Sequence, residues 1–277
     1  MIETEIRNLE TATIDKKTTR EMLSLIQKSN EESVRAVEVA LPKIAIAVEI
    51  ATQTIVSGGR IIYVGAGSSG RLAILDASEC PTTFGVDDST VVALIAGGRD
   101  AVFKAEPAVE DSLLQGRSDM LGLLPTSRDF VIGLSASGGA AYVVGALDAA
   151  RESGSSTASV SSNYSSPISR CVDVEIVTPT GAEPIAGSTR MKAGNAQKMV
   201  LNMISTGAMV KSGKVMGNLM INLRPLNDKL RRRMIGIVSE IANVSADKAL
   251  ALLETHGWSI PEVLETLSVK FKGMQNG

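Results

Sequence analysis

The sequence predicts an α/β fold in which helices cover both faces of a parallel sheet. Short apolar runs rich in β-branched residues alternate with helical segments of about 10–15 residues along the middle of the chain. Strands separated in this way are joined by crossover connections, which makes them parallel. The 277 residues are 44% hydrophobic and 21% charged, which suffices for one sizeable domain and a small appendage.

The chain is expected to begin with a helical segment from Thr18 to about Ser57. Its apolar residues recur every three or four positions, which is the period of an amphipathic helix. Pro42 is expected to bend this helix or to divide it in two. Gly58 and Gly59 end the pattern, and the apolar run 61–64 predicts the first strand.

The later elements follow in regular alternation. A long helical segment is expected after Lys192, and short helices between Arg232 and Gly277 predict a small helical appendage. The other predicted strands span residues 91–96, 130–134, 157–161 and 172–177, and the helices among them span residues 100–115 and 141–153.

A predicted anion-binding loop follows the first strand. Residues 65–70 read Gly-Ala-Gly-Ser-Ser-Gly, and the next helix is expected to open over residues 72–77. Backbone N–H groups at a helix start are unpaired, and the helix dipole adds positive charge there. Ser68 and Ser69 add hydroxyl donors, and Gly67 lets an anion approach the backbone closely. We therefore expect this loop to bind a phosphate.

The same glycine spacing also fits a dinucleotide-binding loop. That pattern requires an acidic residue at the end of the second strand to hold a ribose. Here the second strand ends in Gly97-Gly98-Arg99, and Asp100 comes only after the arginine. A monophosphate is therefore favoured over a dinucleotide.

A second hydroxyl-rich loop follows the third predicted strand. It contains Ser135, Ser137 and Gly138. Both loops fall at the carboxyl ends of strands, where ligands bind in parallel sheets, so we expect them to share one site. Farther along, Arg190 and Lys192 are expected either to cap a helix or to bind an anion.

Carboxylates near these loops are the candidate catalytic groups. Glu79 follows the first loop by about three helical turns and is expected to be buried within reach of its ligand. Glu106 and Glu110 are spaced i, i+4 on the helix expected over residues 100–115, so they share one face unless Pro107 distorts it. Two carboxylates that face one substrate can divide into acid and base.

Composition excludes several other functions. A net charge of −2 argues against nucleic acid as the main partner. His256 is the only histidine, and Cys80 and Cys171 form no metal-binding pattern, so we expect no metal site. The N-terminus lacks the features of a signal peptide, and no stretch of about 20 uncharged apolar residues predicts a membrane span.

The run Gly65–Pro81, which reads GAGSSGRLAILDASECP, strongly resembles the N-acetylmuramic acid 6-phosphate etherases, which have the SIS (sugar isomerase) fold. The resemblance covers about residues 4–235 and implies an SIS domain with N-terminal helices over residues 1–235, followed by a small, truncated helical module over residues 236–277. It continues at Thr4-Glu5, Asn8, Ile14-Asp15, Val109-Glu110-Asp111-Ser112, Gly187–Ala193, Lys211–Lys214 and Gly217–Met220.

The resemblance implies a cytoplasmic, homodimeric enzyme that cleaves the D-lactyl ether of N-acetylmuramic acid 6-phosphate without metal or nucleotide. Its products are N-acetylglucosamine 6-phosphate and D-lactate. In the implied route the sugar ring opens, the C2 proton is removed, lactate leaves C3, and water adds to the double bond. Glu79 matches the acid that protonates the departing lactate oxygen, and Glu110 matches the base. Ser68, Ser69 and Ser137 match hydroxyls around the phosphate.

One loop departs from the family pattern. The family usually has Ala-Ala-Ser-Gly-Arg-Thr-Pro-Tyr after the third strand, whereas residues 135–142 read Ser-Ala-Ser-Gly-Gly-Ala-Ala-Tyr. Gly139 and Ala140 thus replace an arginine and a threonine, and loss of one charge-assisted hydrogen bond costs about 1.5–3 kcal/mol. The Ser135 hydroxyl is expected to compensate in part.

Two alternative functions stay open. The first is a non-catalytic sugar-phosphate-sensing protein, because the glucokinase regulatory protein resembles this fold and also lacks the Arg-Thr-Pro loop. The second is an SIS-type sugar-phosphate isomerase, which also uses a carboxylate base. The presence of both Glu79 and Glu110 favours an enzyme over a sensor, and the segment Asp76–Pro81, which reads Asp-Ala-Ser-Glu-Cys-Pro, argues against the isomerase.

Overall fold

The structure is a computed structural model that describes residues 2–104 and 107–269. Its centre is a five-stranded parallel sheet with the strand order β2-β1-β3-β4-β5. The predicted α/β fold is therefore confirmed. The strands are β1 (Ile61–Gly65), β2 (Val91–Ile95), β3 (Phe130–Leu134), β4 (Ser156–Ser161) and β5 (Val174–Val177).

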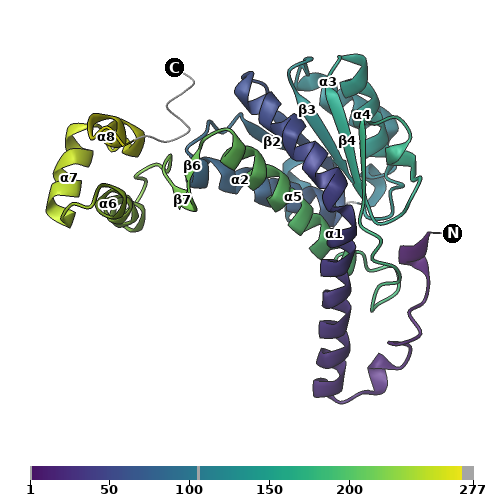
Figure 1. The fold of residues 1–277 in the computed structure, drawn as a ribbon. Helices are drawn as coiled ribbons and strands as arrows, with labels where there is room; N and C mark the ends of the chain where they lie inside the picture. The colour runs from purple at the N-terminus through teal and green to yellow at the C-terminus, as the bar shows by residue number, and fades with distance from the viewer. Residues whose placement is uncertain (1, 105–106, 270–277) are drawn as a thin grey trace.

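Helices cover both faces of the sheet (Figure 1). On one face lie α1 (Thr19–Val56), α2 (Gly67–Phe84) and α5 (Lys192–Lys211), and on the other lie α3 (Leu113–Gly122) and α4 (Ala141–Glu152). Short 3-10 turns complete this part of the chain: η1 (Glu3–Glu5), η2 (Ile14–Lys16), η3 (Gly98–Val102), η4 (Pro107–Val109) and η5 (Pro167–Ser169).

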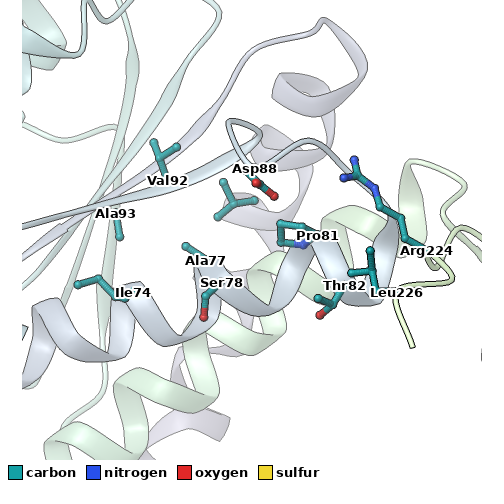
Figure 2. A pocket seen from close by; sticks show the side chains of 11 residues that line it. Ile74, Ala77, Ser78, Pro81, Thr82, Asp88, Val92, Ala93, Arg224 and Leu226 are labelled. Atoms are coloured by element: carbon teal, nitrogen blue, oxygen red, sulfur yellow. The ribbon is translucent and has the colours of Figure 1, made fainter. Parts of the chain in front are cut away.

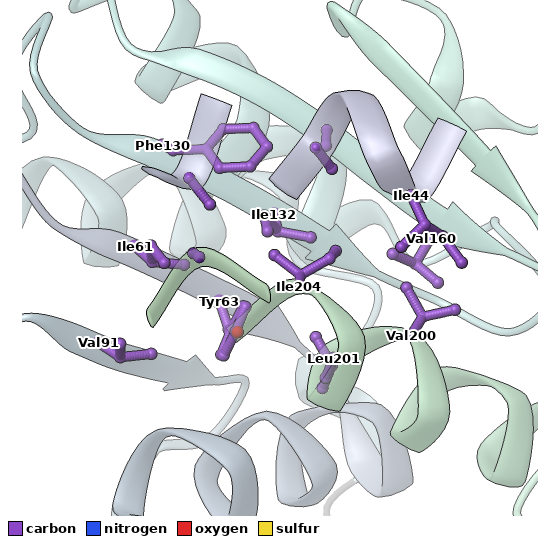
Figure 3. Close-up of a cluster of buried hydrophobic side chains, with 14 of the residues drawn as sticks. Ile44, Ile61, Tyr63, Val91, Phe130, Ile132, Val160, Val200, Leu201 and Ile204 are labelled. Carbon is purple, nitrogen blue, oxygen red and sulfur yellow. The ribbon is translucent and has the colours of Figure 1, made fainter. Parts of the chain in front are cut away.

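The two faces of the sheet carry separate hydrophobic cores, because successive side chains of a strand point in opposite directions. In β1, Ile61 and Tyr63 pack against α1, α2 and α5, as Figure 3 shows. Ile62 and Val64 pack on the other face with α4. Both faces are covered, which explains why β1, β2 and β3 are apolar runs rather than alternating ones. β4, by contrast, reads Ser-Thr-Ala-Ser-Val-Ser.

Helix α1 is continuous through Pro42, so this proline does not divide it. Pro42 is exposed, and the carbonyl group that it leaves without a partner therefore lies at the solvent side of the helix. Thr18 and Glu21 form a capping box at its start. By length and composition α1 could cross a membrane, but here it buries a stripe of small and apolar side chains against the sheet and α5, including Val37, Ala40, Ile44, Ala47 and Ala51.

The predicted helix over residues 100–115 is wrong. The chain forms η3 and η4 there, and α3 begins only at Leu113. Pro107 opens η4, and the Ser112 hydroxyl caps α3 by accepting the N–H of Gln115 at 3.2 Å. Glu110 therefore lies between η4 and α3, and the expected shared helical face with Glu106 does not exist. Glu106 itself lies outside the described residues.

The C-terminal part of the described chain has a core of its own. It consists of the hairpin β6 (Val215–Met216) and β7 (Leu219–Met220) and three helices, α6 (Asp228–Ala242), α7 (Ala246–Thr255) and α8 (Ile260–Thr266). In Figure 1 these helices lie beside the sheet and its covering helices. Helix α6 includes residue 235, so the domain boundary expected after this residue falls within a helix. The division into two domains stays a prediction.

A partly buried ion pair joins Arg60, which precedes β1, to Asp129, which precedes β3. Asp129 is 3% exposed and accepts hydrogen bonds from the N–H and the guanidinium of Arg60 at 2.8–3.1 Å and from the N–H of Thr126 at 2.9 Å. Burial alone would raise the pKa of Asp129, but the hydrogen bonds from Arg60 and Thr126 outweigh it and hold this pKa below its ordinary value.

Replacing Asp129 with alanine is therefore expected to lower the free energy of unfolding by about 3 kcal/mol. Because the folded pKa is depressed, the contribution is complete above the unfolded pKa of about 3.9 and is lost as the pH falls through the folded value. Urea unfolding at pH 7 and pH 3 measures both effects. Asp148→Ala, which breaks an exposed pair with Arg151, is the control and should cost less than about 1 kcal/mol.

Candidate active site

The first predicted phosphate loop lies at the carboxyl end of β1. Helix α2 begins at Gly67 rather than at Leu72, so the two serines of this loop lie in its first turn. A Cβ atom on Gly70 would lie 2.5 Å from the Ile95 side chain and 2.9 Å from the Gly65 carbonyl oxygen. Glycine therefore allows α2 to start directly against the sheet, with its first N–H groups at the strand end.

The two serines of this turn point to different surroundings. Ser69 is buried, and its hydroxyl donates to Oε1 of Gln197 on α5 at 2.9 Å. Ser68 is half-buried and lines an open hollow together with Arg71, Arg190 and Lys198. Ser68 is therefore the hydroxyl that an incoming anion can reach, and Ser69 fixes α2 to α5.

The second predicted loop follows β3 and is held in shape by its own hydroxyls. Ser135 is buried, and its oxygen accepts the N–H groups of Gly138 at 3.1 Å and Ala140 at 3.4 Å. Ser137 is half-buried and accepts the N–H of Gly139 at 3.2 Å. Gly138 has a φ of +79°, and a Cβ atom there would lie 2.1 Å from the side chain of Ser166, so this position requires glycine.

The structure places the two loops side by side and Glu110 next to the helix that follows the second loop. In the sheet, Gly65 at the end of β1 pairs with Leu134 at the end of β3, so the loops lie side by side. The carbonyl oxygen of Glu110 accepts the N–H of Tyr142 at 3.0 Å, which places Glu110 next to the first turn of α4. Glu110 is half-buried, and burial, followed by the charge of Asp111, raises the pKa of its carboxyl. A base with a raised pKa is well matched to proton removal near neutral pH.

Glu79 lies elsewhere, and its expected burial is wrong. It is exposed on α2, 12 residues after Gly67, which at 1.5 Å per residue is roughly 18 Å along the helix. It lines a hollow between α2 and α5 with Lys198 and Asn202. Within one chain the structure therefore does not bring Glu79 to the phosphate loops or to Glu110.

The buried carboxylate of α2 is Asp76, one turn before Glu79. Asp76 is 5% exposed and accepts hydrogen bonds from Tyr63 at 3.0 Å, Asn202 at 2.6 Å and Ser205 at 3.2 Å. Burial raises its pKa, and these donors offset the rise in part. The helical period of the buried residues around it could have indicated its position, because Asp76 falls on the inward face of α2 and Glu79 falls outside it.

The partial positive charge at the start of α5 is already neutralised by a carboxylate of the same chain. Both oxygens of the fully buried Glu183 carboxylate accept N–H groups there, from Lys192 at 2.8 Å and from Ala193 at 3.0 Å. The Lys192 ammonium is buried and pairs with Glu32 of α1. Lys192 therefore links α5 to α1. The start of α2 and the loop after β3 are the segments that remain to bind an anion at this edge of the sheet.

Several polar side chains at this edge are buried without a hydrogen-bond partner among the described residues. Such an atom costs about 1–3 kcal/mol, which a polar ligand can recover. Ser162 directly follows β4 and Thr180 lies three residues after β5, and the others are Thr4, Ser33 and the Nε2 atom of Gln197.

Comparison with known proteins places the chain in a family. Residues 43–151 match the family of the glucokinase regulatory protein N-terminal SIS domain. N-acetylmuramic acid 6-phosphate etherases of Salmonella choleraesuis and Serratia proteamaculans are 46% identical over 265 residues, which is 95% of this chain and 89% of each relative. The chain belongs to the N-acetylmuramic acid 6-phosphate etherase family. The expected resemblance is thereby confirmed.

The fold of this etherase-family chain is also found in a solved structure. A phosphoheptose isomerase from Francisella tularensis superposes with a TM-score of 0.54 and is 15% identical, covering 70% of this chain and 99% of that one. This similarity shows the SIS fold alone.

The etherase-family chain also has hollows away from the strand ends. One of about 710 Å³ lies between α2, β2 and the segment around Arg224 and Leu226, as Figure 2 shows. None of the predicted site residues lines it. In residues 2–104 and 107–269, no group of three or more His, Cys, Asp or Glu side chains is placed to hold a metal ion.

Proposed function

We propose that this chain cleaves the D-lactyl ether of N-acetylmuramic acid 6-phosphate and releases D-lactate and N-acetylglucosamine 6-phosphate. The observation that carries the proposal is the position of Glu110 beside two loops suited to phosphate, in a chain of the etherase family. The reaction requires a bound phosphate and a base near C2 of the sugar. The two loops are suited to bind the phosphate, and Glu110 is suited to act as the base.

The phosphate is bound between the start of α2 and the loop after β3. The N–H groups of Gly67 and Ser68 and the hydroxyl of Ser68 donate from one side, and the hydroxyl of Ser137 donates from the other. The N–H of Gly138 is already bonded to Ser135, so Gly138 contributes by letting the phosphate approach the loop closely. Ser69 and Ser135 hold the two segments in place through the hydrogen bonds described above. Backbone N–H groups and hydroxyls at a helix start suffice to bind a phosphate.

Glu110 removes the C2 proton of the open-chain sugar, which the C1 aldehyde makes acidic. The electron pair forms the C2–C3 double bond, and the C3–O bond to lactate breaks. Glu79 donates a proton to the departing oxygen, because a lactate alkoxide is a poor leaving group. Water then adds its oxygen to C3, and a proton returns to C2, so the second product carries a hydroxyl where the ether stood.

Because Glu79 lies far from the loops of its own chain, we propose that it acts in the site of a second copy. Helices α1, α2 and α5 expose apolar side chains around it, including Val34, Leu75 and Met203, and a homodimer would cover such a surface. We further propose that the dimer works in the cytoplasm, in the recycling of cell-wall amino sugars.

A second candidate is a regulatory protein that binds the sugar phosphate without cleaving it. The loop around Gly139 and Ala140 favours it, because this loop lacks the arginine and threonine of the etherase pattern, and the match to the glucokinase regulatory protein domain is consistent with it. Assay of D-lactate release from N-acetylmuramic acid 6-phosphate separates the two functions, since only the etherase produces lactate.

Restoring the arginine at position 139 is expected to strengthen substrate binding. A Cβ atom on Gly139 meets only the Ser137 hydroxyl, at 3.6 Å, so a side chain fits there. One charge-assisted hydrogen bond contributes about 1.5–3 kcal/mol, which corresponds to a KM about 10- to 150-fold lower for Gly139→Arg. Steady-state kinetics of lactate release measures it. Gly139→Met, of similar length without charge, is the control, and equal KM values for both variants would contradict the prediction.

A further inference from the structure

The N-terminal segment lies over the carboxyl ends of β4 and β5. The N–H of Glu3 donates to Oδ1 of Asn163 at 2.8 Å, and the carbonyl oxygen of Thr4 accepts the N–H of Gly187 at 3.3 Å. In Figure 1 this segment runs beside the loop that leads into α5. Farther along, Asn8 donates to the carbonyl oxygen of Ala182 at 3.2 Å and Thr11 to that of Pro184 at 2.8 Å.

One side chain joins this segment to the predicted phosphate site. The amide nitrogen of Asn163 donates to the carbonyl oxygens of Ala136 and Ser137, both at 3.3 Å. Asn163 therefore binds Glu3 with its oxygen and the loop after β3 with its nitrogen. The N-terminal segment thus lies against the loop that carries Ser137.

Thr4 occupies the buried side of this contact. Its side chain is 0% exposed, and its hydroxyl has no hydrogen-bond partner among the described residues. Ser162, directly after β4, and Thr180, three residues after β5, also hold buried hydroxyls without partners among these residues. A valine would fill the same volume without the cost of an unpaired hydroxyl. Packing therefore does not explain a hydroxyl at position 4, whereas a polar ligand does.

We propose that residues 3–6 form one wall of the sugar-phosphate site and that the Thr4 hydroxyl, which is covered in the ligand-free chain, binds a hydroxyl of the sugar when the ligand displaces the side chains that cover it. This inference rests on the proposed function in taking the ligand to be a sugar phosphate. The phosphate is assigned to the loops after β1 and β3, so the sugar carbons extend toward the ends of β4 and β5. Thr4 is then a substrate-binding residue supplied by the beginning of the chain.

The test compares Thr4→Val with Thr4→Ser, using N-acetylglucosamine 6-phosphate as the probe in calorimetric titration. Loss of one hydrogen bond is expected to weaken binding about fivefold in Thr4→Val, and Thr4→Ser should keep the affinity of the wild type. The Tm of ligand-free Thr4→Val should equal or exceed that of the wild type, because no hydrogen bond of the folded chain is lost.

Thr11→Val is the matched control on the same segment. Its hydroxyl is hydrogen-bonded to Pro184, so this variant should lower Tm and leave the affinity unchanged. Unchanged affinity in Thr4→Val would overturn the inference. Lactate release is measured on the same samples: a wild-type chain that binds the probe but releases no lactate contradicts the etherase proposal, while a loss of affinity in Thr4→Val still supports the role of Thr4.

Discussion

Replacing Glu110 with glutamine is expected to lower kcat for D-lactate release by about 10²–10⁴-fold, the usual contribution of a general base. The amide keeps the size of the side chain but cannot accept the C2 proton. Affinity for N-acetylglucosamine 6-phosphate should be unchanged, because the loops after β1 and β3 hold the phosphate. Steady-state kinetics and calorimetric titration separate these two effects.

The pH dependence gives a second measure of the same residue. Glu110 must be ionised to act as a base, so kcat/KM should fall as the pH decreases through its raised pKa. Asp111→Asn is the control: it removes the neighbouring charge that helps to raise this pKa, so the acidic limb should move to lower pH while kcat is retained. A Glu110→Gln variant with the kcat of the wild type would exclude Glu110 as the base.

Mixing Glu79→Gln with Glu110→Gln chains is expected to restore activity that neither variant has alone. If each site takes Glu110 from one chain and Glu79 from the other, every mixed dimer contains one site with both carboxylates intact. Random pairing makes half of the dimers mixed, so the preparation should reach about one quarter of wild-type activity. The reason is the position of Glu79, roughly 18 Å along α2 from Gly67.

The experiment is best done by co-expressing the two variants with different affinity tags and purifying on both, which leaves only mixed dimers and raises the expected activity to about one half of that of the wild type. Doubly tagged dimers that contain Glu79→Gln in both chains control for the procedure and should stay inactive. Mixed dimers that remain inactive would show that both carboxylates must come from the same chain, which contradicts the proposed role of the second copy.

Most of the fold was predictable because it depends on local patterns. Most of the strands are apolar runs bounded by glycine or polar residues, although β4 is rich in serine. β3 matches its prediction at both ends. The helix predicted over residues 100–115 is wrong because Pro107 and the capping hydroxyl of Ser112 break the chain into short turns. The break predicted at Pro42 is also wrong, because the helix continues through it. An exposed proline within a well-packed helix costs only one hydrogen bond at the solvent side.

The candidate site was predictable only as far as chain neighbours define it. Ser68 and Ser137 could be predicted to lie near one another because they follow strands whose carboxyl ends meet at one edge, whereas Glu110 was chosen by the family resemblance. The contacts of Ser69 with Gln197 and of Asn163 with Glu3 join residues more than 100 positions apart, and no local pattern specifies them. Glu79 is exposed because it lies outside the face of α2 that packs inward, whereas Asp76 lies on that face.

The most direct test of the central claim is the reaction of the purified chain with N-acetylmuramic acid 6-phosphate in D2O. We expect one D-lactate for each substrate molecule consumed. The N-acetylglucosamine 6-phosphate should carry a deuterium at C2, because Glu110 removes the C2 proton and a deuteron from the solvent replaces it. A folded chain that binds the sugar phosphate but releases no lactate would contradict the account and favour the regulatory function.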